Sequence, residues 1–469
     1  METSLSFTSA LAVAQLIRDR QVSPVEVIEA SLERIERLNP TLNCFCFVYP
    51  EEAIESARAA ERAVHSGKPL GALHGVPIAI KDLTPTRGKR TTKGSYIHEH
   101  DVPQHDAVIV ERLLTAGAIM VGKTTTPEYA HTFVTQSPLW GVTRNPWDLD
   151  HIPGGSSGGS AVAVATGCVA LAEGSDMGGS VRTPASFSGV VGLKPSFGRI
   201  PFDILPSQFD QTCHFGPLAR SVDDAALFLR VTQGPDDRDI QSQASPSEVP
   251  VPASMALRGK RIAFSRGLGY CAIDADVEKN FLAAIELLRS NGAVVEEVDP
   301  GFSPQYEASG WSHWDAYFAA LLGEQLAEWR EKMDPALVEI IERGQQLPAI
   351  ELKKIEFVRT ELWHKLRPIL AQFDILMCPT TALPAPRIGE TDFGQIDEHG
   401  QFHGLELTFP FNLVGQCPAL AMPSGFTSEG LPTSVQIVGR RYDDVTVLGI
   451  GAALEKLLPP FAHPPMALV

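Results

Sequence analysis

Two turns rich in glycine and serine carry the residues best suited to chemistry. The first is "GGSSGGS", residues 154–160, and the second is "MGGS", residues 177–180. A serine hydroxyl is a weak nucleophile and needs a base beside it. Lys81 ends the apolar run "VPIAIK", and a lysine buried in apolar surroundings loses its proton more readily than one in water. These residue types together favour acyl transfer by an activated serine, for which serine-lysine arrangements are known.

Three shorter patterns suggest other chemistries, but each lacks its structural context. "GAIMVGKT", residues 117–124, fits the phosphate-binding pattern G-x-x-x-x-G-K-[ST], yet a predicted helix precedes it and strand-forming residues fill its middle. "GGSSG" fits the nucleophile elbow G-x-S-x-G at Ser156, yet a polar loop precedes it instead of a buried strand. The histidines of "HEHDVPQHD", His98, His100 and His105, lack the spacing of a metal site. We therefore expect no metal and no cofactor.

The long segment around both turns closely resembles the signature of the amidase signature family of serine hydrolases. It reads "GGSSGGSAVAVATGCVALAEGSDMGGSVRTPASFSGVVGLKPSFGR", residues 154–199. The similarity extends to "HGVPIAIKDL" before it and to "FGPLARSVDDAALFL" and "DILMCPTTALPAPRIG" after it, and is weakest over about residues 234–373. The resemblance implies the amidase signature fold, an α/β structure in which a large mixed, twisted sheet is flanked by helices on both faces.

The resemblance also implies a Ser–cis-Ser–Lys triad. Ser180 would be the nucleophile, Ser156 would relay its proton, and Lys81 would be the base. Four backbone N–H groups would stabilise the oxyanion, those of Met177, Gly178, Gly179 and Ser180. Four residues are expected to support the site: Gly155, which precedes Ser156 through a cis peptide bond, Ser157, Asp176 and Arg182.

The implied reaction is the hydrolysis of a linear amide to a carboxylic acid and an amine through an acyl-enzyme. Aromatic residues are interpreted as lining a pocket for aryl or other apolar amides, namely Tyr129, Phe133, Trp311, Trp314 and Tyr317. The alternative is that "GWSHWDAYFAALL" is a helix that buries its apolar face. Two other functions stay open: a carbamate (urethane) or ester hydrolase with the same triad, and a glutamine-amidotransferase A-type subunit that acts on misacylated tRNA.

The amino-acid composition and the N-terminal sequence argue against several binding partners and against an exported protein. The formal net charge of −17 argues against binding to nucleic acid or to an anionic membrane surface. The seven cysteines include no C-x-x-C, which argues against a disulfide framework or a zinc ribbon. The N-terminal sequence lacks the pattern of a signal peptide. We expect a cytoplasmic enzyme that acts on a small-molecule amide, carbamate or ester, with a homodimer as one candidate assembly.

The surrounding elements must position these residues. "SPVEVIEASLERIERL" begins with a capping box at Ser23 and predicts a helix. Strands and helices then alternate, with a strand ending at Lys81, a helix beginning near Ser157, and the unit "RIAFS", helix 274–291, "AVVEEV". This alternation predicts the α/β class.

We expect one domain over residues 1–469, made of three parts: a mainly helical segment (1–67), the signature core with the catalytic residues (68–233), and a C-terminal part that completes the sheet and pocket (234–469). The polar stretch 234–254 is interpreted as a surface excursion or a boundary. The basic residues of "TPTRGKRTTKGS", Lys93 among them, are expected in a solvated loop.

Overall fold

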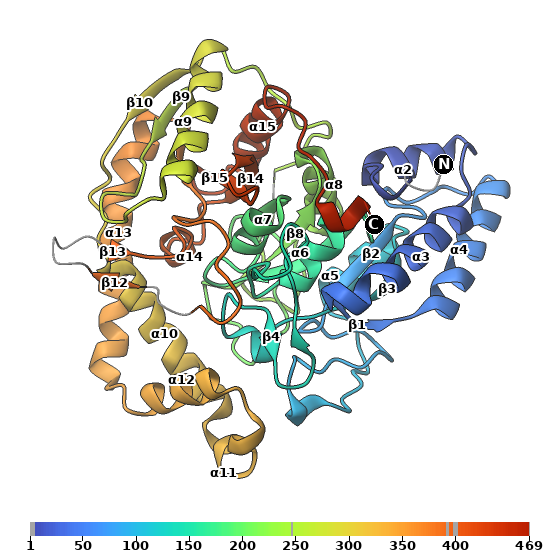
Figure 1. Ribbon diagram of the computed structural model, residues 1–469, viewed down its shortest axis with the longest axis horizontal. Helices are drawn as coiled ribbons and strands as arrows, with labels where there is room; N and C mark the ends of the chain where they lie inside the picture. The colour runs from blue at the N-terminus through green and yellow to red at the C-terminus, as the bar shows by residue number, and fades with distance from the viewer. Residues whose placement is uncertain (1–4, 245–246, 391–393, 397–401, 469) are drawn as a thin grey trace.

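One mixed sheet of 11 strands runs through the molecule (Figure 1). The computed structural model describes residues 5–244, 247–390, 394–396 and 402–468. In sheet order the strands are β1 (Phe45–Val48), β3 (Ile119–Thr124), β2 (Pro77–Lys81), β6 (Leu171–Asp176), β8 (His214–Ala219), β7 (Val191–Lys194), β14 (Ala419–Phe426), β15 (Pro432–Gly439), β11 (Ile375–Pro379), β9 (Arg261–Phe264) and β10 (Val294–Glu297). Neighbours are parallel in β3–β2–β6 and in β11–β9–β10, and antiparallel elsewhere.

Helices cover both faces of this sheet, which confirms the predicted α/β architecture. One face buries a core with α2 (Ala10–Arg18), α5 (Val108–Thr115), α8 (Val222–Thr232), α9 (Ala275–Ser290) and α15 (Asp444–Glu455). The other face packs against α3 (Pro24–Leu42), α4 (Pro50–His65), α6 (Gly158–Ala165) and α7 (Arg182–Ser188).

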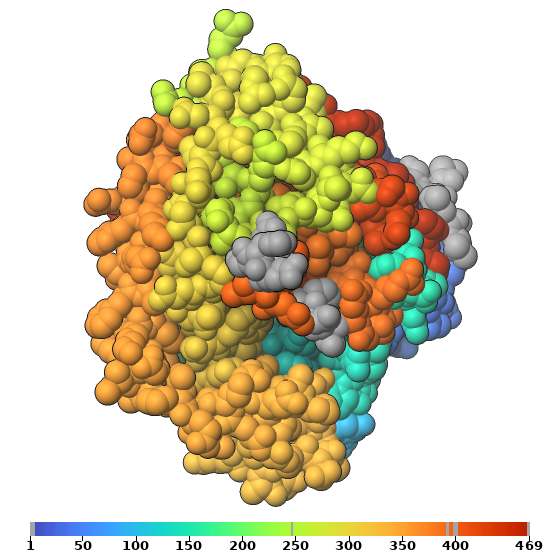
Figure 2. All heavy atoms as spheres, turned by 60° about the vertical axis from the view of Figure 1, so that its left-hand side comes forward, coloured from blue at the N-terminus to red at the C-terminus, as the bar shows by residue number. Residues whose placement is uncertain are grey.

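The remaining helices lie at one end of the sheet. They are α10 (Gln305–Leu322), α11 (Leu326–Trp329), α12 (Pro335–Gln345), α13 (Ala349–Gln372) and α14 (Pro410–Leu413). Two short strand pairs lie outside the large sheet: β4 (Gln136–Ser137) with β5 (Gly141–Val142), and β12 (Gln395–Ile396) with β13 (Phe402–His403). Figure 2 shows the yellow and orange helices of the 305–345 region projecting at the lower edge, with a hollow between them and the body of the molecule.

Local sequence signals account for several element boundaries. Ser23 caps α3 through a capping box with Glu26, as predicted. Gly117 has a φ of +89° and ends the turn between α5 and β3. Residues 119–124 then form a buried strand instead of a phosphate-binding loop, so that chemistry is ruled out for this segment.

The alternation of β2 decides where Lys81 points. Ile78 and Ile80 pack in the core on the α8 side, whereas Ala79 packs on the α6 side. Successive side chains of a strand point to opposite faces, so Lys81 emerges on the α6 side with Ala79. The first glycine-serine turn leads directly into α6, so the strand and the helix bring the lysine and the serines together.

The polar stretch 234–254 contains no described helix or strand. Gln243 donates its backbone N–H to the Gly198 carbonyl, and Ser247 accepts a hydrogen bond from Arg199. Residues 245 and 246 of this stretch lie outside the described residues. In the described part of the chain, the helices are all too short or too polar to cross a membrane.

Candidate active site

Lys81 lies at the centre of a group of buried hydroxyls. Its Nζ is 2.7 Å from Ser156 Oγ, 2.9 Å from Ser175 Oγ and 3.0 Å from Ser157 Oγ. All four residues are buried. The arrangement gives the amine three hydroxyl neighbours and shields it from solvent.

Burial changes the charge state of this lysine. It lowers the pKa of Lys81 to about 7, while the carboxylates of Glu173 and Asp176 act in the opposite direction. Glu173 is close by, because its Oε2 accepts the backbone N–H of Lys81 at 2.9 Å. With a pKa near the operating pH, a substantial fraction of the amine is neutral and able to accept a proton.

The first glycine-serine turn presents Ser156 to the lysine. The Gly155–Ser156 peptide bond is cis, as the family resemblance implies. A side chain at Gly155 would collide with a neighbouring loop, because its Cβ would lie 2.7 Å from the backbone carbonyl carbon of Phe133. Ser157 precedes α6, but its hydroxyl makes no helix-capping hydrogen bond and points to Lys81 instead. Its backbone N–H donates to the Ser180 carbonyl at 3.1 Å, which ties the two turns together.

The second turn presents Ser180 and a set of unused donors. Within the described residues, the backbone N–H groups of residues 177–180 donate to no protein acceptor, and the Ser180 hydroxyl makes no hydrogen bond. Gly179 has a φ of +140°, and a Cβ there would lie 2.1 Å from Thr408 Oγ1. The turn thus needs glycine and leaves its amides free for a developing negative charge. Serine–base hydrogen bonds are often long in unliganded enzymes, so the free Ser180 hydroxyl is compatible with catalysis.

A buried ion pair holds this turn. Arg182 donates from Nε and Nη2 to the two carboxylate oxygens of Asp176, each at 2.9 Å. Asp176 also accepts the Val181 backbone N–H at 3.3 Å. Burial alone would raise the pKa of Asp176, but Arg182 holds it well below its usual range. The pair therefore stays charged and fixes the two ends of the turn.

The hydroxyls face a cavity of about 120 Å³. Ser156, Ser175, Ser180 and Asp176 line its polar side, and Met177 of the second turn lines it as well. Its other walls are mainly apolar and include Tyr129, Trp314 and Tyr317, together with Leu83, Phe202, Ile204, Leu205, Pro206, Phe318 and Leu321. The structure thus brings Ser156, Ser180 and three of the five predicted pocket residues to one cavity, and Lys81 contacts Ser156 from outside its lining.

Two predicted pocket residues and one predicted loop residue are corrected by the structure. Trp311 packs against Phe409 with ring centroids 5.5 Å apart, although it lies only one helical turn before Trp314 on α10. Phe133 packs in a separate apolar cluster with Ile152 and Phe187. Neither side chain is among the described residues that line the cavity. Lys93 is half-buried and lines the cavity, so its loop is not simply solvated as expected.

Sequence reasoning missed two polar residues that contact Lys81. Ser175 and Glu173 lie two residues apart on β6, "LAEGSD", so they share one face of that strand. Their signal was available, because Glu173 and Ser175 are polar residues at alternate positions of a strand that is buried throughout. The loop residues 202–206 had no such signal, since their sequence shows no periodic pattern.

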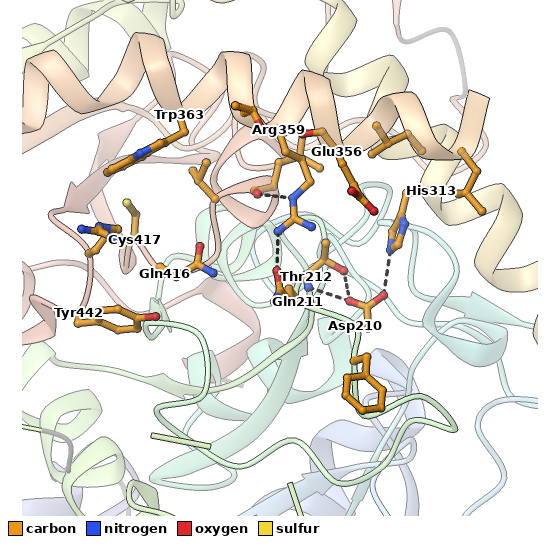
Figure 3. Close-up of a pocket in the computed structure, with 17 residues that line it drawn as sticks. Asp210, Gln211, Thr212, His313, Glu356, Arg359, Trp363, Gln416, Cys417 and Tyr442 are labelled. Atoms are coloured by element: carbon orange, nitrogen blue, oxygen red, sulfur yellow. Dashed lines mark hydrogen bonds and ion pairs between the residues drawn. The ribbon is translucent and has the colours of Figure 1, made fainter. Parts of the chain in front are cut away.

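A larger cavity of about 790 Å³ lies next to this site (Figure 3). Arg359 of α13 donates from Nε to the Leu413 carbonyl at 2.8 Å, and His313 pairs with Asp210 at 2.9 Å. Residues 210–212 line the larger cavity, while Cys213 lines the smaller one, so this short segment separates the two. Among its described lining residues are no lysine and no serine, and therefore it lacks the serine–lysine chemistry of the smaller cavity.

The described residues also contain no group of three or more His, Cys, Asp or Glu side chains arranged to hold a metal ion. His98 contacts Asp101 and Lys93 instead. The chemistry available in the cavity is therefore that of a buried amine, several hydroxyls and free backbone amides.

Known proteins are similar to this chain in both sequence and fold. The family model described as Amidase matches residues 26–448. An acylamidase from Rhodococcus erythropolis is 34% identical over 465 residues, which is 98% of this chain and 97% of the relative. The A-type subunit of the glutamyl-tRNA(Gln) amidotransferase of Carboxydothermus hydrogenoformans is 35% identical over 480 residues, with 96% and 97% covered. A crystal structure of a bacterial aryl acylamidase of the amidase signature family superposes with a TM-score of 0.92 at 29% identity and covers 98% of both chains.

Proposed function

This chain belongs to the amidase signature family of amidohydrolases, and from that premise we propose that Ser180 attacks the amide carbonyl while Ser156 and Lys81 carry away its proton. One observation supports this assignment above the others. The Nζ of Lys81 lies 2.7 Å from the Oγ of Ser156, which lines the same cavity as Ser180, and burial lowers the pKa of this lysine to about 7. A buried, partly neutral amine beside a serine pair is the base that a serine nucleophile requires.

The proposed reaction begins with a proton transfer. Neutral Lys81 takes the Ser156 hydroxyl proton, and Ser156 takes the proton of Ser180 as the Ser180 oxygen bonds to the carbonyl carbon. The carbonyl becomes a tetrahedral oxyanion. When it collapses, the carbon–nitrogen bond breaks, and the proton returns through Ser156 to the leaving amine. Water then attacks the acyl-enzyme by the same route and releases the carboxylic acid.

The second turn stabilises the oxyanion in this proposal. The backbone N–H groups of residues 177–180 donate to no acceptor within the described protein. Fixed donors of this kind are worth about 3–4 kcal/mol each in acyl-transfer transition states. Asp176 and Arg182 are positioning residues, because they hold the turn and line up its amides without taking a proton.

The cavity supports an aryl or other apolar amide as substrate. Its walls beyond the hydroxyls are mainly aromatic and aliphatic. A cavity of about 150 Å³ in another protein binds benzene, so about 120 Å³ suits a group the size of a small ring or a short chain. The structural similarity to a bacterial aryl acylamidase supports the same class. A carbamate or an ester would meet the same triad and remains the alternative within this mechanism.

A second candidate function rests on the similarity to amidotransferase subunits. The relative from Carboxydothermus hydrogenoformans matches nearly its whole length to this chain. A subunit of that kind would release ammonia from glutamine and pass it on within a complex. The purified chain distinguishes the two functions: an amidase hydrolyses aryl amides alone, whereas an amidotransferase subunit requires glutamine and its partner proteins.

A substrate panel with product masses tests the proposal. We expect the isolated protein to release acid and amine from anilides faster than from acetamide or glutamine. Ser180→Ala should abolish turnover and leave the far-ultraviolet circular dichroism unchanged, since the side chain supports no packing. Residual activity above a few per cent in Ser180→Ala would refute the choice of nucleophile, and faster turnover of acetamide would refute the substrate class.

A further inference from the structure

One end of the catalytic cavity carries a lysine that the triad does not use. Lys93 lines the cavity, and its Nζ lies 5.7 Å from the ring centroid of Tyr129, which lines it too. Backbone hydrogen bonds fix the position of Lys93, whose N–H donates to the Asp82 carbonyl at 2.9 Å and whose carbonyl accepts the Tyr129 N–H at 2.7 Å. The ammonium is therefore held beside the strand that ends in Lys81.

This ammonium is poorly compensated. Within the described residues Lys93 forms no ion pair with a carboxylate, and the only hydrogen bond of its side chain runs to His98 Nε2 at 3.4 Å. His98 in turn contacts Asp101, so the imidazole ring lies between the Asp101 carboxylate and the Lys93 ammonium. An ammonium carries three N–H donors, of which two are left unused here.

Apolar residues make up most of the remaining cavity wall, with Leu83 and Leu321 among them. Tyr129 lines the cavity too, but its hydroxyl is buried with almost no accessible surface and so does not offer a donor to a ligand. Among the described lining residues, Lys93 is the only one with a cationic side chain.

We propose that Lys93 selects amides whose buried group carries a carboxylate. A carboxylate accepts hydrogen bonds only, at about four positions, and so matches a positively charged side chain that offers two unused N–H groups. Charge-assisted hydrogen bonds of this kind are roughly twice as strong as neutral ones. This inference rests on the proposed function, because it names the substrate class of the same cavity.

Matched substrate pairs test the proposal on the full-length enzyme. N-phenylsuccinamate and butyranilide carry a carboxylate or a methyl group on the acyl side. 4-Acetamidobenzoate and 4-methylacetanilide differ in the same way on the amine side. We expect the enzyme to prefer the charged member of one pair, and the pair concerned identifies which half of the substrate occupies the cavity.

Two variants separate recognition from a general loss of activity. Lys93→Met, which keeps the length of the side chain, should lower kcat/KM for the preferred carboxylate by about 10- to 100-fold, mainly through KM. Lys89→Met is the matched control, because Lys89 lies in the same loop but pairs with Glu52 at 2.6 Å; it should leave both members of each pair unchanged.

The outcomes distinguish this inference from the proposed function. If the neutral anilides are hydrolysed but neither carboxylate is preferred, the recognition of a carboxylate is refuted and the amidase assignment stands. Equal effects of Lys93→Met on charged and neutral members would also refute it. If the wild-type enzyme hydrolyses neither neutral nor charged amides, the proposed function itself fails.

Discussion

The pH dependence of amide hydrolysis tests whether Lys81 is the base. Acylation requires the neutral amine in the proposed mechanism, and burial lowers the pKa of Lys81 from 10.5 to about 7. An increase in pH through this value removes the proton, so kcat/KM should rise with pH and then level off. The rate rises with pH, and does not fall, because a general base accepts a proton only in its deprotonated form.

The magnitude follows from the same pKa. With a pKa of about 7, the neutral fraction is about 9% at pH 6 and about 91% at pH 8, so kcat/KM should increase about tenfold between them. A lysine with a pKa of 10.5 would be only about 0.03% neutral at pH 7. Burial therefore raises the amount of active base about a thousandfold at neutral pH.

The assay measures aniline release from a neutral anilide between pH 5 and 9 at low substrate concentration. Other groups also titrate in this range, because burial shifts the pKa of Lys194, Glu406 and Glu455 to about 7 and that of Glu307 to about 8. Lys194 and Glu406 serve as controls. The Nζ of Lys194 donates to backbone carbonyls, and neither residue lines the catalytic cavity. Lys194→Gln and Glu406→Gln should therefore keep the midpoint of the wild-type profile. Burial lowers the pKa of His214 to about 3, so it does not titrate in this range.

Two results would refute this reasoning. A profile that is flat between pH 6 and 8, or whose midpoint lies above pH 9, would show that no buried amine with a pKa of about 7 limits acylation. A midpoint that moves in Lys194→Gln or Glu406→Gln would assign the titration to that other group.

Three further predictions concern the second turn and the absence of a metal. Asp176→Asn leaves the buried Arg182 without its counter-charge and should reduce the free energy of unfolding by about 3–5 kcal/mol in urea denaturation. The control is Asp236→Asn in a surface ion pair, which should reduce it by less than about 1 kcal/mol. Equal losses in the two variants would contradict this explanation. Gly179→Ala should lower kcat by about 100-fold or more, because its Cβ would meet a threonine hydroxyl at 2.1 Å and displace the amides. Gly88→Ala, where a Cβ meets nothing within 4 Å, should keep kcat. Extended dialysis against EDTA should leave activity unchanged; a loss that zinc restores would overturn the metal-free mechanism.

Local patterns made much of the fold and the triad candidates predictable. The capping box at Ser23, the strand that ends at Lys81 and the glycine-serine turns are short-range signals, and each element begins or ends within a few residues of the predicted position. The resemblance to a known family then connected Lys81 with the two turns, which no local pattern does. Neither source gives distances, so the contact between Ser175 and Lys81 came only from the structure.

The pocket was less predictable because its walls depend on tertiary packing. Trp311 and Trp314 lie three residues apart on α10, yet only Trp314 lines the cavity. The rotation of that helix about its axis depends on its contacts with neighbouring helices, which the sequence does not specify. Lys93 lies in a polar loop whose composition predicts exposure, and its position follows from backbone hydrogen bonds to residues 82 and 129.

The contacts of Arg182 also bear on when the protein becomes active during its synthesis. Besides Asp176, its guanidinium donates to the Thr408 carbonyl, to Asn412 and to Gln436, which follow it by 226, 230 and 254 residues. A nascent chain that has translated the signature turns but not residue 436 therefore holds a charged group that lacks most of its partners. Translation must reach residue 436, in the last strand of the sheet to be synthesised, before all of these contacts can form, so we expect a product that ends before this residue to be unstable and inactive.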